Sequence, residues 1–362
     1  MNKILILGDI NSTHTIKWVN GLCDKGFEVG VFTNEIPNNN WYNNEPKISA
    51  FFSEKNKINF KNKIVQLFAY LNSIYLLKKT IKSFKPDIIH AFYASSYGLL
   101  GAISNFHPYF ISSWGSDVYL FPRINIITNA ILKYNFRKAD KIFATSLALS
   151  QEMKLFSKKE SIIIPFGVDT DFFKPNDISI KSDKIVIGTV KSLETIYGID
   201  ILIRAFAIIC QNNPNKNLEL VIIGSGSEKN NLVNQINELN LSEKIILKGR
   251  IEKDKIVELI NSFDIAAFLS RSESFGVALL ECASCSLPLI GSNVGGIPEI
   301  INNGVNGFLV PIDNLQEIVK KIEILINDEI LRKQFGREGR KLVESKYIFE
   351  ESLKKMIQFY QN

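Results

Sequence analysis

Short runs of apolar, often β-branched residues alternate along this chain with longer stretches in which apolar residues recur every three or four positions. The short runs are typical of strands buried on both faces, and the longer stretches are typical of helices that pack on one side. Regular alternation of the two predicts parallel sheets with helices on both faces. The predicted fold class is therefore α/β, with doubly wound sheets.

The predicted strands fall into two groups of similar size. In the first half they are Lys3–Leu7, Glu28–Phe32, Asp87–Ala91, Tyr109–Ser113, Lys141–Thr145 and Ile162–Pro165. In the second half they are Lys184–Val190, Leu218–Ile223, Lys244–Leu247, Ile265–Leu269, Leu287–Ile290 and Gly307–Val310. The stretch 167–183 between them is rich in Pro, Asn, Asp and Ser and is predicted to be a linker.

A chain of 362 residues exceeds what one hydrophobic core usually serves. Two domains are therefore expected, at 1–166 and 184–346, followed by an amphipathic helix at 347–362. Apolar residues make up 46% and charged residues 22%, which is ordinary for a globular protein. The net charge of +6 is too small to indicate nucleic-acid binding, so no nucleic-acid partner is expected.

No stretch reaches the roughly eighteen uncharged apolar residues that a membrane span needs. Only Ile4–Leu7 follow Lys3 before Gly8, which is too short for a signal peptide, so we expect a cytoplasmic protein. Eight lysines surround the apolar run Ile64–Leu77 and predict a basic helix: Lys55, Lys57, Lys61, Lys63, Lys78, Lys79, Lys82 and Lys85. They fit either the solvated face of an ordinary surface helix or peripheral docking on an anionic membrane.

The cysteines Cys23, Cys210, Cys282 and Cys285 are too scattered for a disulfide framework. Cys282 and Cys285 form a CxxC without a second pair, and the chain has only three histidines to complete a metal site. We therefore predict small buried packing residues, with no metal and no cofactor.

In open α/β sheets, ligands bind outside the carboxyl ends of the strands. The segments that follow predicted strands are Gly8–His14, Trp114–Asp117, Val190–Gly198, Gly224–Gly226, Ser270–Glu281 and Ser292–Glu299. Gly224–Gly226 lacks the third glycine of a dinucleotide fingerprint and is predicted to be a tight turn.

Ser270–Glu281 has the strongest chemical pattern of these segments. A helix that begins near Gly276 offers unpaired backbone N–H groups and a positive dipole end to a diphosphate. Glu273 precedes that helix start and Glu281 lies more than a turn inside, so the two carboxylates flank the phosphate position. Carboxylates there need hydroxyl donors, as a nucleotide sugar provides. The alternative is two exposed glutamates at chance spacing.

The spacing of Glu273 and Glu281 in ESFGVALLE resembles the signature of retaining glycosyltransferase family 4, whose fold is called GT-B. Other segments resemble that family's landmarks in the same order, so the resemblance spans nearly the whole chain. They are Pro86–His90, Trp114–Asp117, Ala139–Ser146, Ile164–Asp169, Gly291–Ile300 and Asn303–Pro311.

The resemblance implies two facing Rossmann-like domains and a C-terminal helix that returns to the first. It implies a nucleotide diphosphate sugar donor, UDP-linked by default, and a glycan or lipid-linked glycan acceptor in surface polysaccharide or lipopolysaccharide synthesis. Glu273 would bind the donor sugar, Glu281 the ribose, and Ser274, Phe275 and Gly276 the diphosphate. Retaining transfer would need no protein nucleophile, and no Asp-x-Asp stands at a strand end to bind a metal.

Two positions depart from the family pattern. Where the family has Gly-Arg-Leu, three residues and Lys-Gly, this chain has Lys191-Ser-Leu-Glu-Thr-Ile-Tyr197-Gly198. We expect the displaced Lys191 to supply the phosphate charge, unless it is an ordinary surface lysine, with Arg250 and Arg271 as fallback cations. Trp114 stands where many relatives have a histidine that contacts the donor sugar.

Asp117 is expected either to bind a sugar hydroxyl or to cap a helix. Asn11, Ser12 and His14 form the loop that the family directs toward phosphate or acceptor, and His14 equally fits a capping or packing role.

Two other activities fit the same fold. One is a nucleotide-sugar 2-epimerase, which binds the donor without an acceptor, and the other is a non-catalytic sugar- or lipid-binding partner. Nucleotide release that requires an acceptor would distinguish the transferase from both.

Overall fold

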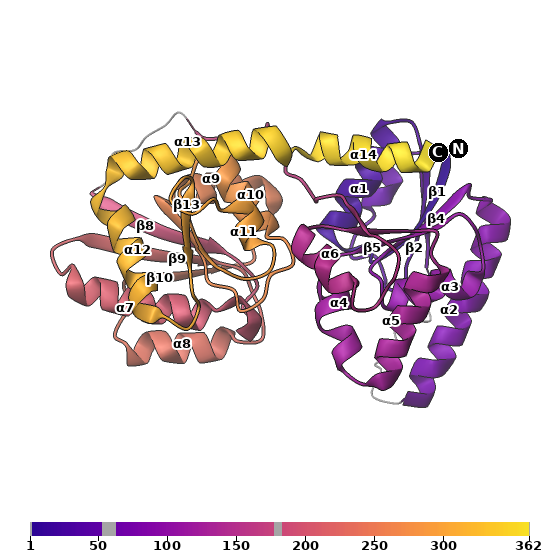
Figure 1. The fold of residues 1–362 in the computed structure, drawn as a ribbon, viewed down its shortest axis with the longest axis horizontal. Helices are drawn as coiled ribbons and strands as arrows, with labels where there is room; N and C mark the ends of the chain where they lie inside the picture. The colour runs from indigo at the N-terminus through magenta and orange to yellow at the C-terminus, as the bar shows by residue number, and fades with distance from the viewer. Residues whose placement is uncertain (1, 53–62, 177–182, 362) are drawn as a thin grey trace. The chain divides into compact units, whose positions relative to one another are not determined.

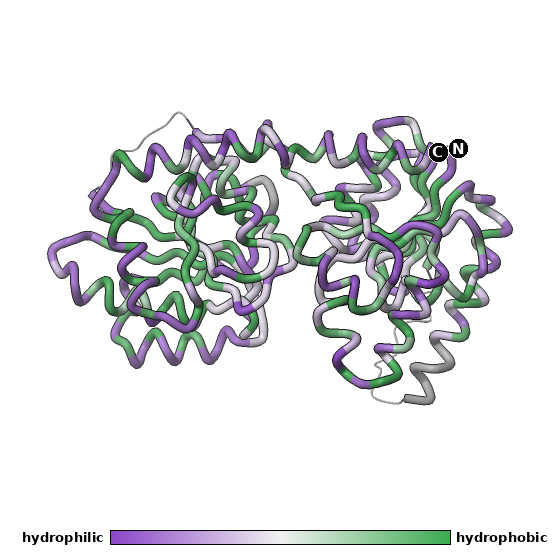
Figure 2. The backbone as a smooth tube through the Cα atoms, viewed as in Figure 1, coloured by the Kyte–Doolittle hydropathy of each residue, from purple (hydrophilic) through white to green (hydrophobic). Residues whose placement is uncertain are grey.

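The computed structural model describes residues 2–52, 63–176 and 183–361. The chain forms two compact units (Figure 1): unit 1 comprises residues 1–166 and 350–362, and unit 2 comprises residues 167–349. In each unit the strands are coloured as hydrophobic, while many helix positions are coloured as hydrophilic (Figure 2). Each unit therefore has its own apolar core.

Unit 1 contains a seven-stranded sheet in the order β3-β2-β1-β4-β5-β6-β7. All of its strand pairs are parallel. The strands are β1 (Lys3–Leu7), β2 (Glu28–Phe32), β3 (Ile48–Phe51), β4 (Ile88–Phe92), β5 (Tyr109–Ser113), β6 (Lys141–Ala144) and β7 (Ile162–Ile163).

The helices of unit 1 cover both faces of this sheet. They are α1 (Thr13–Asp24), η1 (Trp41–Asn44), α2 (Lys63–Phe84), α3 (Ser96–Ser104), α4 (Ser116–Tyr119), η3 (Phe121–Arg123), α5 (Ile126–Lys138), α6 (Leu147–Met153) and α14 (Phe349–Gln361). Leu77 of α2, Leu100 of α3 and Phe136 of α5 belong to one buried cluster with Ile89 of β4. These three helices therefore share one face of the sheet.

The last helix, α14, packs on unit 1 although unit 2 precedes it in the sequence. Tyr360 is fully buried, its hydroxyl lies 2.6 Å from His90 Nδ1, and its ring stacks on Phe110. The chain enters and leaves unit 2 at adjacent points, because Val168 N–H donates to the Tyr347 carbonyl and Phe349 N–H donates to the Val168 carbonyl. This pairing directs α14 back to unit 1.

Unit 2 contains a six-stranded parallel sheet in the order β10-β9-β8-β11-β12-β13. The strands are β8 (Lys184–Val190), β9 (Asn217–Ile223), β10 (Ile245–Gly249), β11 (Ile265–Phe268), β12 (Leu289–Ser292) and β13 (Gly307–Val310). The helices are η4 (Thr195–Tyr197), α7 (Ile199–Asn212), α8 (Lys229–Glu238), α9 (Lys253–Asn261), α10 (Val277–Ser284), α11 (Ile297–Ile300), α12 (Leu315–Asn327) and α13 (Glu329–Lys346). Leu202 and Phe206 of α7 pack with Ile318 and Ile322 of α12 in its core.

The predicted fold class is confirmed, since both sheets are parallel and covered by helices. The strand β3 was not predicted, because its four residues lie at the sheet edge between polar segments and have little apolar pattern. The prediction for β12 is two residues early: the Pro288 carbonyl accepts from Ala266 N–H, but regular pairing begins at Leu289.

Part of the predicted lysine cluster can be located. Lys55, Lys57 and Lys61 lie outside the described residues, and Lys63 begins α2. Lys78, Lys79, Lys82 and Lys85 are exposed at the carboxyl end of α2 and just after it. No helix in the described part of the chain combines the length and apolar character needed to span a bilayer.

Candidate functional site

The loops that follow β8, β11 and β12 meet at the carboxyl edge of the unit 2 sheet, because these strands are neighbours in it. Lys191 follows β8, Glu273 follows β11, and Gly295–Gly296 follow β12. The three segments are distant in sequence, and the sheet order brings them together.

Lys191 and Glu273 form an ion pair at this edge. Lys191 Nζ lies 2.5 Å from Glu273 Oε2, although the geometry is not that of a well-aligned hydrogen bond. The side chains are only 14% and 8% exposed. Lys191 is therefore not an ordinary surface lysine, and Glu273 is not an exposed glutamate at chance spacing.

The ring of Tyr197 also contacts the Lys191 ammonium group. Its ring centroid lies 4.3 Å from Lys191 Nζ, within the range of a cation–π interaction. Tyr197 occupies the position where the family pattern has lysine, so the aromatic ring supports the displaced cation. The sequence showed the substitution, but only the structure shows this contact.

A glycine pair fixes the backbone of Glu273. Gly296 N–H donates to the Glu273 carbonyl at 3.0 Å. Gly295 has φ +51, and a Cβ there would lie 1.8 Å from the same carbonyl oxygen. A side chain at Gly295 would therefore displace the Glu273 loop. The need for glycine at this position was not predicted, although Gly295 and Gly296 lie in the segment Gly291–Ile300 that resembles the family pattern.

Helix α10 begins directly after this loop. Gly276 precedes its first residue in a left-handed conformation, with φ +102, which glycine adopts without the strain that a side chain brings. The amides of the first turn point out of the helix end, toward the position predicted for a diphosphate. Phe275 is buried, with its ring centroid 5.7 Å from that of Tyr347, and Ser274 is partly exposed.

Glu281 lies in the middle of α10 and is partly exposed. Burial raises the pKa of the Cys285 thiol to about 12, and the nearby Glu281 carboxylate adds to the effect. Burial likewise raises the pKa of Cys282 well above its ordinary value. These inert, buried thiols match the packing role predicted for the CxxC pair.

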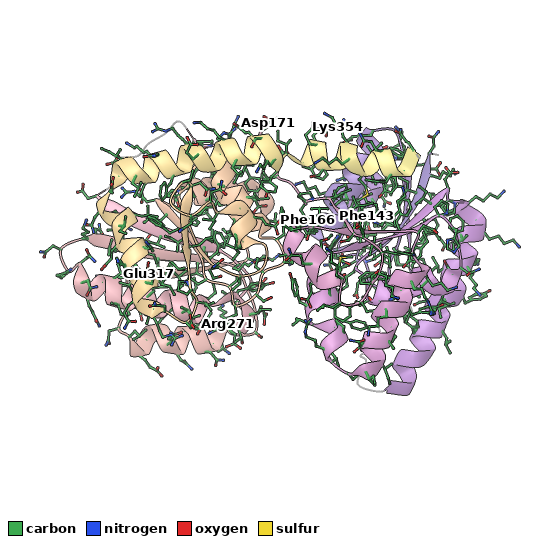
Figure 3. The ribbon with its side chains drawn as sticks, in the orientation of Figure 1. Phe143, Phe166, Asp171, Arg271, Glu317 and Lys354 are labelled. Atoms are coloured by element: carbon green, nitrogen blue, oxygen red, sulfur yellow. The ribbon has the colours of Figure 1, made fainter. Side chains whose placement is uncertain are left out.

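Arg271, labelled in Figure 3, is held by hydrogen bonds to Asp200 and Thr195. Its guanidinium donates to both carboxylate oxygens of Asp200, each at 2.8 Å, and to the Thr195 carbonyl at 2.5 Å. Burial opposes ionisation of Asp200, but the hydrogen bond and charge of Arg271 outweigh it and lower the pKa of Asp200. Arg271 thus fixes the η4 turn that contains Tyr197, while Arg250 is exposed after β10.

Gly224–Gly226, predicted to be a tight turn, is irregular backbone that supports the Lys191 loop, and the turn lies just after it at Ser227 and Glu228. A Cβ at Gly224 would lie 1.9 Å from the Lys191 carbonyl oxygen. Glu194 reaches the same turn, where it accepts from Ser227 N–H at 2.9 Å and from the Ser227 hydroxyl at 2.5 Å, and these hydrogen bonds lower its pKa. The loop that contains Lys191 is therefore held against the segment that follows β9.

In unit 1, Asp117 is fully buried. Its carboxylate accepts from the backbone N–H groups of Ala94 at 2.7 Å, Gly115 at 2.7 Å and Trp114 at 3.1 Å. Burial raises the pKa of Asp117, although these hydrogen bonds act in the opposite direction. Both oxygens accept hydrogen bonds from backbone amides in the loops after β4 and β5, so Asp117 ties these two loops together. Asp117 is not the cap of α4, because Gly115 holds that position, and its contact with a sugar hydroxyl stays a prediction.

His14 and Trp114 belong to an aromatic cluster at the carboxyl edge of the unit 1 sheet. The His14 ring stacks on Phe166 with centroids 4.2 Å apart, and the Trp114 ring lies 5.3 Å from Phe166 (Figure 3 labels Phe166). Both His14 and Trp114 remain partly exposed. His14 therefore has the packing contacts that were expected as one alternative, while its ring still borders solvent.

Asn11 and Ser12 shape the start of α1. The Asn11 side-chain amide donates to the Ile36 carbonyl at 3.0 Å, and its oxygen accepts from Asn38 N–H at 2.8 Å. Asn11 thus joins the loops after β1 and β2. Ser12 is the residue preceding α1, and its hydroxyl makes no capping hydrogen bond.

Among the described residues, no group of three or more His, Cys, Asp and Glu side chains is arranged to hold a metal ion.

Comparison with known proteins assigns the family. Residues 171–342 match the family described as Glycosyl transferases group 1, and residues 3–146 match the family described as Glycosyl transferase 4-like. The uncharacterized glycosyltransferase MJ1178 of Methanocaldococcus jannaschii is 30% identical over 277 residues, 75% of each chain. The N-acetyl-alpha-D-glucosaminyl L-malate synthase of Bacillus anthracis is 25% identical, over 72% of this chain and 71% of that one. The capsular polysaccharide biosynthesis glycosyltransferase CapM of Staphylococcus aureus is 29% identical, over 66% and 62%.

Solved structures share the fold. Sucrose-phosphate synthase from Thermosynechococcus elongatus superposes with a TM-score of 0.87 at 18% identity, over 100% of this chain and 98% of that one. Anabaena Alr3699/HepE in complex with UDP and glucose superposes with a TM-score of 0.83 at 18% identity, over the whole of both chains. The family matches in both halves and the relative at 30% identity show that this chain belongs to the glycosyl transferases group 1, that is, glycosyltransferase family 4 with the GT-B fold.

Proposed function

We propose that this glycosyltransferase moves a hexose or N-acetylhexosamine from a UDP-linked donor to a glycan or lipid-linked glycan, with retention of configuration, at the cytoplasmic face of the cell membrane. The observation that carries the proposal is the largely buried Lys191–Glu273 pair beside the start of α10. The names of the relatives support the chemistry, since they include a glucosaminyl malate synthase and a capsular polysaccharide transferase. A protein of the same fold was solved with UDP and glucose.

In this proposal, different residues of unit 2 bind different parts of the donor. The first-turn amides of α10 bind the diphosphate, and Lys191 neutralises the charge that develops on it as the glycosidic bond breaks. Glu273 accepts hydrogen bonds from the donor sugar, and Glu281 accepts them from the ribose. Lys191 is held in place by Tyr197 and Glu273, so little reorganisation is needed when the leaving phosphate forms.

The chemical step needs no protein nucleophile. The acceptor hydroxyl attacks the anomeric carbon on the face that the diphosphate leaves, and a donor phosphate oxygen takes the hydroxyl proton. Glu273 and Glu281 do not act as the acid and base pair of a glycosidase, because a helix start separates them and they serve opposite ends of the ligand. We also propose that backbone amides and Lys191 replace a divalent cation at the diphosphate.

The test combines binding and turnover. Calorimetry with UDP, GDP, ADP and CDP, followed by their sugar derivatives, identifies the base and the sugar. Release of the nucleoside diphosphate is then measured with and without extracted glycan or lipid-linked acceptors. Release that depends on an acceptor supports the transferase, whereas sugar isomerisation without acceptor indicates an epimerase. Failure to bind any nucleotide would contradict the proposal.

A further inference from the structure

The segment between α4 and α5 exposes a compact group of large aliphatic side chains. Leu120 is 51% exposed, Ile124 67%, Ile126 85% and Ile127 67%. Single exposed aliphatic residues are common on protein surfaces, but four within eight positions form a patch that needs a partner. We call these four residues the aliphatic corner.

The corner is held in place by its own hydrogen bonds. Asn125 caps α5, since its side-chain oxygen accepts from Ile127 N–H at 2.9 Å and Thr128 N–H at 3.0 Å. Asn125 N–H in turn donates to the Thr128 hydroxyl at 3.1 Å. On the other side, Arg123 donates to the Tyr119 carbonyl at 2.7 Å. The isoleucines are therefore presented on an ordered helix start.

The charged residues around the corner are predominantly basic. Residues 118–139 contain four basic and no acidic residues, and α2 on the same face of the sheet also lacks Asp and Glu. Lys133 and Arg137 of α5 are exposed, as are Lys78, Lys79 and Lys82 of α2. Arg123 forms an ion pair with Glu152, and within the described part of the chain Lys133 and Arg137 form no such pair. This surface complements an anionic one.

The two helices share one arrangement of apolar and basic positions. In α2, Leu71 and Tyr75 are 51% and 66% exposed, and the exposed Lys78 follows Leu71 by seven positions. In α5, Lys133 follows Ile126 by the same seven positions. Seven helical residues span about 10 Å, or two turns. In both helices an exposed lysine therefore follows an exposed apolar side chain by two turns.

The direction of the helices links this surface to the ligand edge. Helices that join parallel strands run opposite to them, so the first residues of α2 and α5 lie toward the carboxyl edge of the unit 1 sheet. The aliphatic corner is thus on the side of unit 1 that also presents His14 and Trp114.

We propose that the aliphatic corner inserts into the interface of an anionic phospholipid bilayer while the cations of α2 and α5 contact the lipid phosphates. The docking is independent of the transfer chemistry, and it would place the carboxyl edge of unit 1 where a lipid-linked acceptor emerges. A second copy of the chain is a poorer occupant, because a two-fold contact through this surface would bring the same uncompensated cations together.

Vesicle sedimentation of the full chain tests the docking without donor or acceptor. We expect binding to phosphatidylcholine vesicles that contain phosphatidylglycerol and little binding to phosphatidylcholine alone. The triple variant Ile124→Ser, Ile126→Ser, Ile127→Ser leaves the Asn125 cap intact and should bind at least about tenfold more weakly, the factor typical of burying even one isoleucine. The matched control is Ile330→Ser, at a residue that is 79% exposed in α13, and it should bind as the unmodified protein does.

A second readout detects insertion directly. Tryptophan emission of Ile126→Trp should shift to the blue and be quenched by brominated lipid when anionic vesicles are added, while Ile330→Trp should not respond. Equal binding by the triple variant and the Ile330→Ser control would overturn the proposal. So would sedimentation velocity that shows a dimer lost in the triple variant, because the corner would then be a protein interface. Neither outcome would affect the proposed transfer reaction.

Discussion

Neutralising Lys191 should destabilise unit 2 as well as slow turnover. Lys191→Met keeps most of the side-chain volume and removes the charge, which leaves the Glu273 carboxylate, only 8% exposed, without its cation. Removal of one partner from a buried ion pair typically costs 3–5 kcal/mol. Lys191 is 14% exposed and water can partly replace it, so we expect the lower end, about 3 kcal/mol.

A double-mutant cycle separates the pair from its surroundings. Glu273→Gln removes the carboxylate charge, and in the double variant neither charge remains buried alone. The double variant should therefore lose less stability than the sum of the single losses, by about 1–3 kcal/mol, as residues in contact usually do. Turnover should not recover in the double variant, since the cation for the leaving phosphate is still absent.

The tryptophans make the assay specific to one unit. Trp18, Trp41 and Trp114 all belong to unit 1, so tryptophan fluorescence follows that unit, whereas far-ultraviolet circular dichroism follows both. In urea titrations, Lys191→Met should move the dichroism transition and leave the fluorescence transition in place. Additive stability losses in the double variant would show that the two charges do not interact. They would refute the claim that Glu273 holds Lys191 in position.

Four further outcomes are expected. Activity should persist in excess EDTA. A complete loss that magnesium or manganese restores would show that a metal ion, not Lys191, neutralises the diphosphate charge. Glu281→Ala should weaken binding of the free nucleoside diphosphate by about 1.5–3 kcal/mol in calorimetry, as for a lost hydrogen bond involving a charged group. Glu273→Gln should leave that binding unchanged. The same loss in both variants would contradict the proposal that Glu281 binds the ribose and Glu273 the sugar. Arg271→Ala should lower turnover less than Lys191→Ala, because Arg271 is tied to Asp200; equal or larger losses would assign the phosphate contact to Arg271, with Arg250 tested next. Burial lowers the pKa of His90 from 6.5 to about 3, so the unfolded state binds a proton that the folded state does not, and unit 1 should lose stability as pH falls below about 6.5. Between about pH 7 and pH 5 the loss should be about 2 kcal/mol in fluorescence-monitored urea titrations and smaller in His90→Gln; equal losses would exclude His90 as the cause.

Much of the fold followed from local patterns in the sequence. The strands β1, β2, β5 and β8 were predicted with the bounds that the structure has, and so was the edge strand β13, because each contains a recognisable apolar run. The edge strand β3 has four residues, most of them half exposed, between polar segments, and it carried no such pattern. The start of α10 at Gly276 was also a local property, because the glycine and the helix formers after it specify it.

The roles of several candidate residues depended on partners far away in sequence. The order of the sheet puts β8 beside β11, and only that neighbourhood pairs Lys191 with Glu273. The sequence makes Arg271 a candidate cation for the phosphate, but in the structure both of its terminal nitrogens donate hydrogen bonds to Asp200. The position of Asp117 after a strand made it a candidate to bind a sugar hydroxyl, yet in the fold its carboxylate is buried and bonds backbone amides from two loops.

The sequence by itself determined where most of the strands run, where the first turn of α10 begins and how many residues separate Glu273 from Glu281, because hydrophobic periodicity and helix initiation are set by residues within a few positions of one another. The tertiary structure alone decided which charges are paired, which aromatic rings meet and which aliphatic side chains stay uncovered. His90 and Tyr360 are 270 positions apart, and their hydrogen bond exists because α14 packs on the first sheet. Such contacts depend on strand order and helix docking, which the burial of the whole apolar surface determines and no local pattern records.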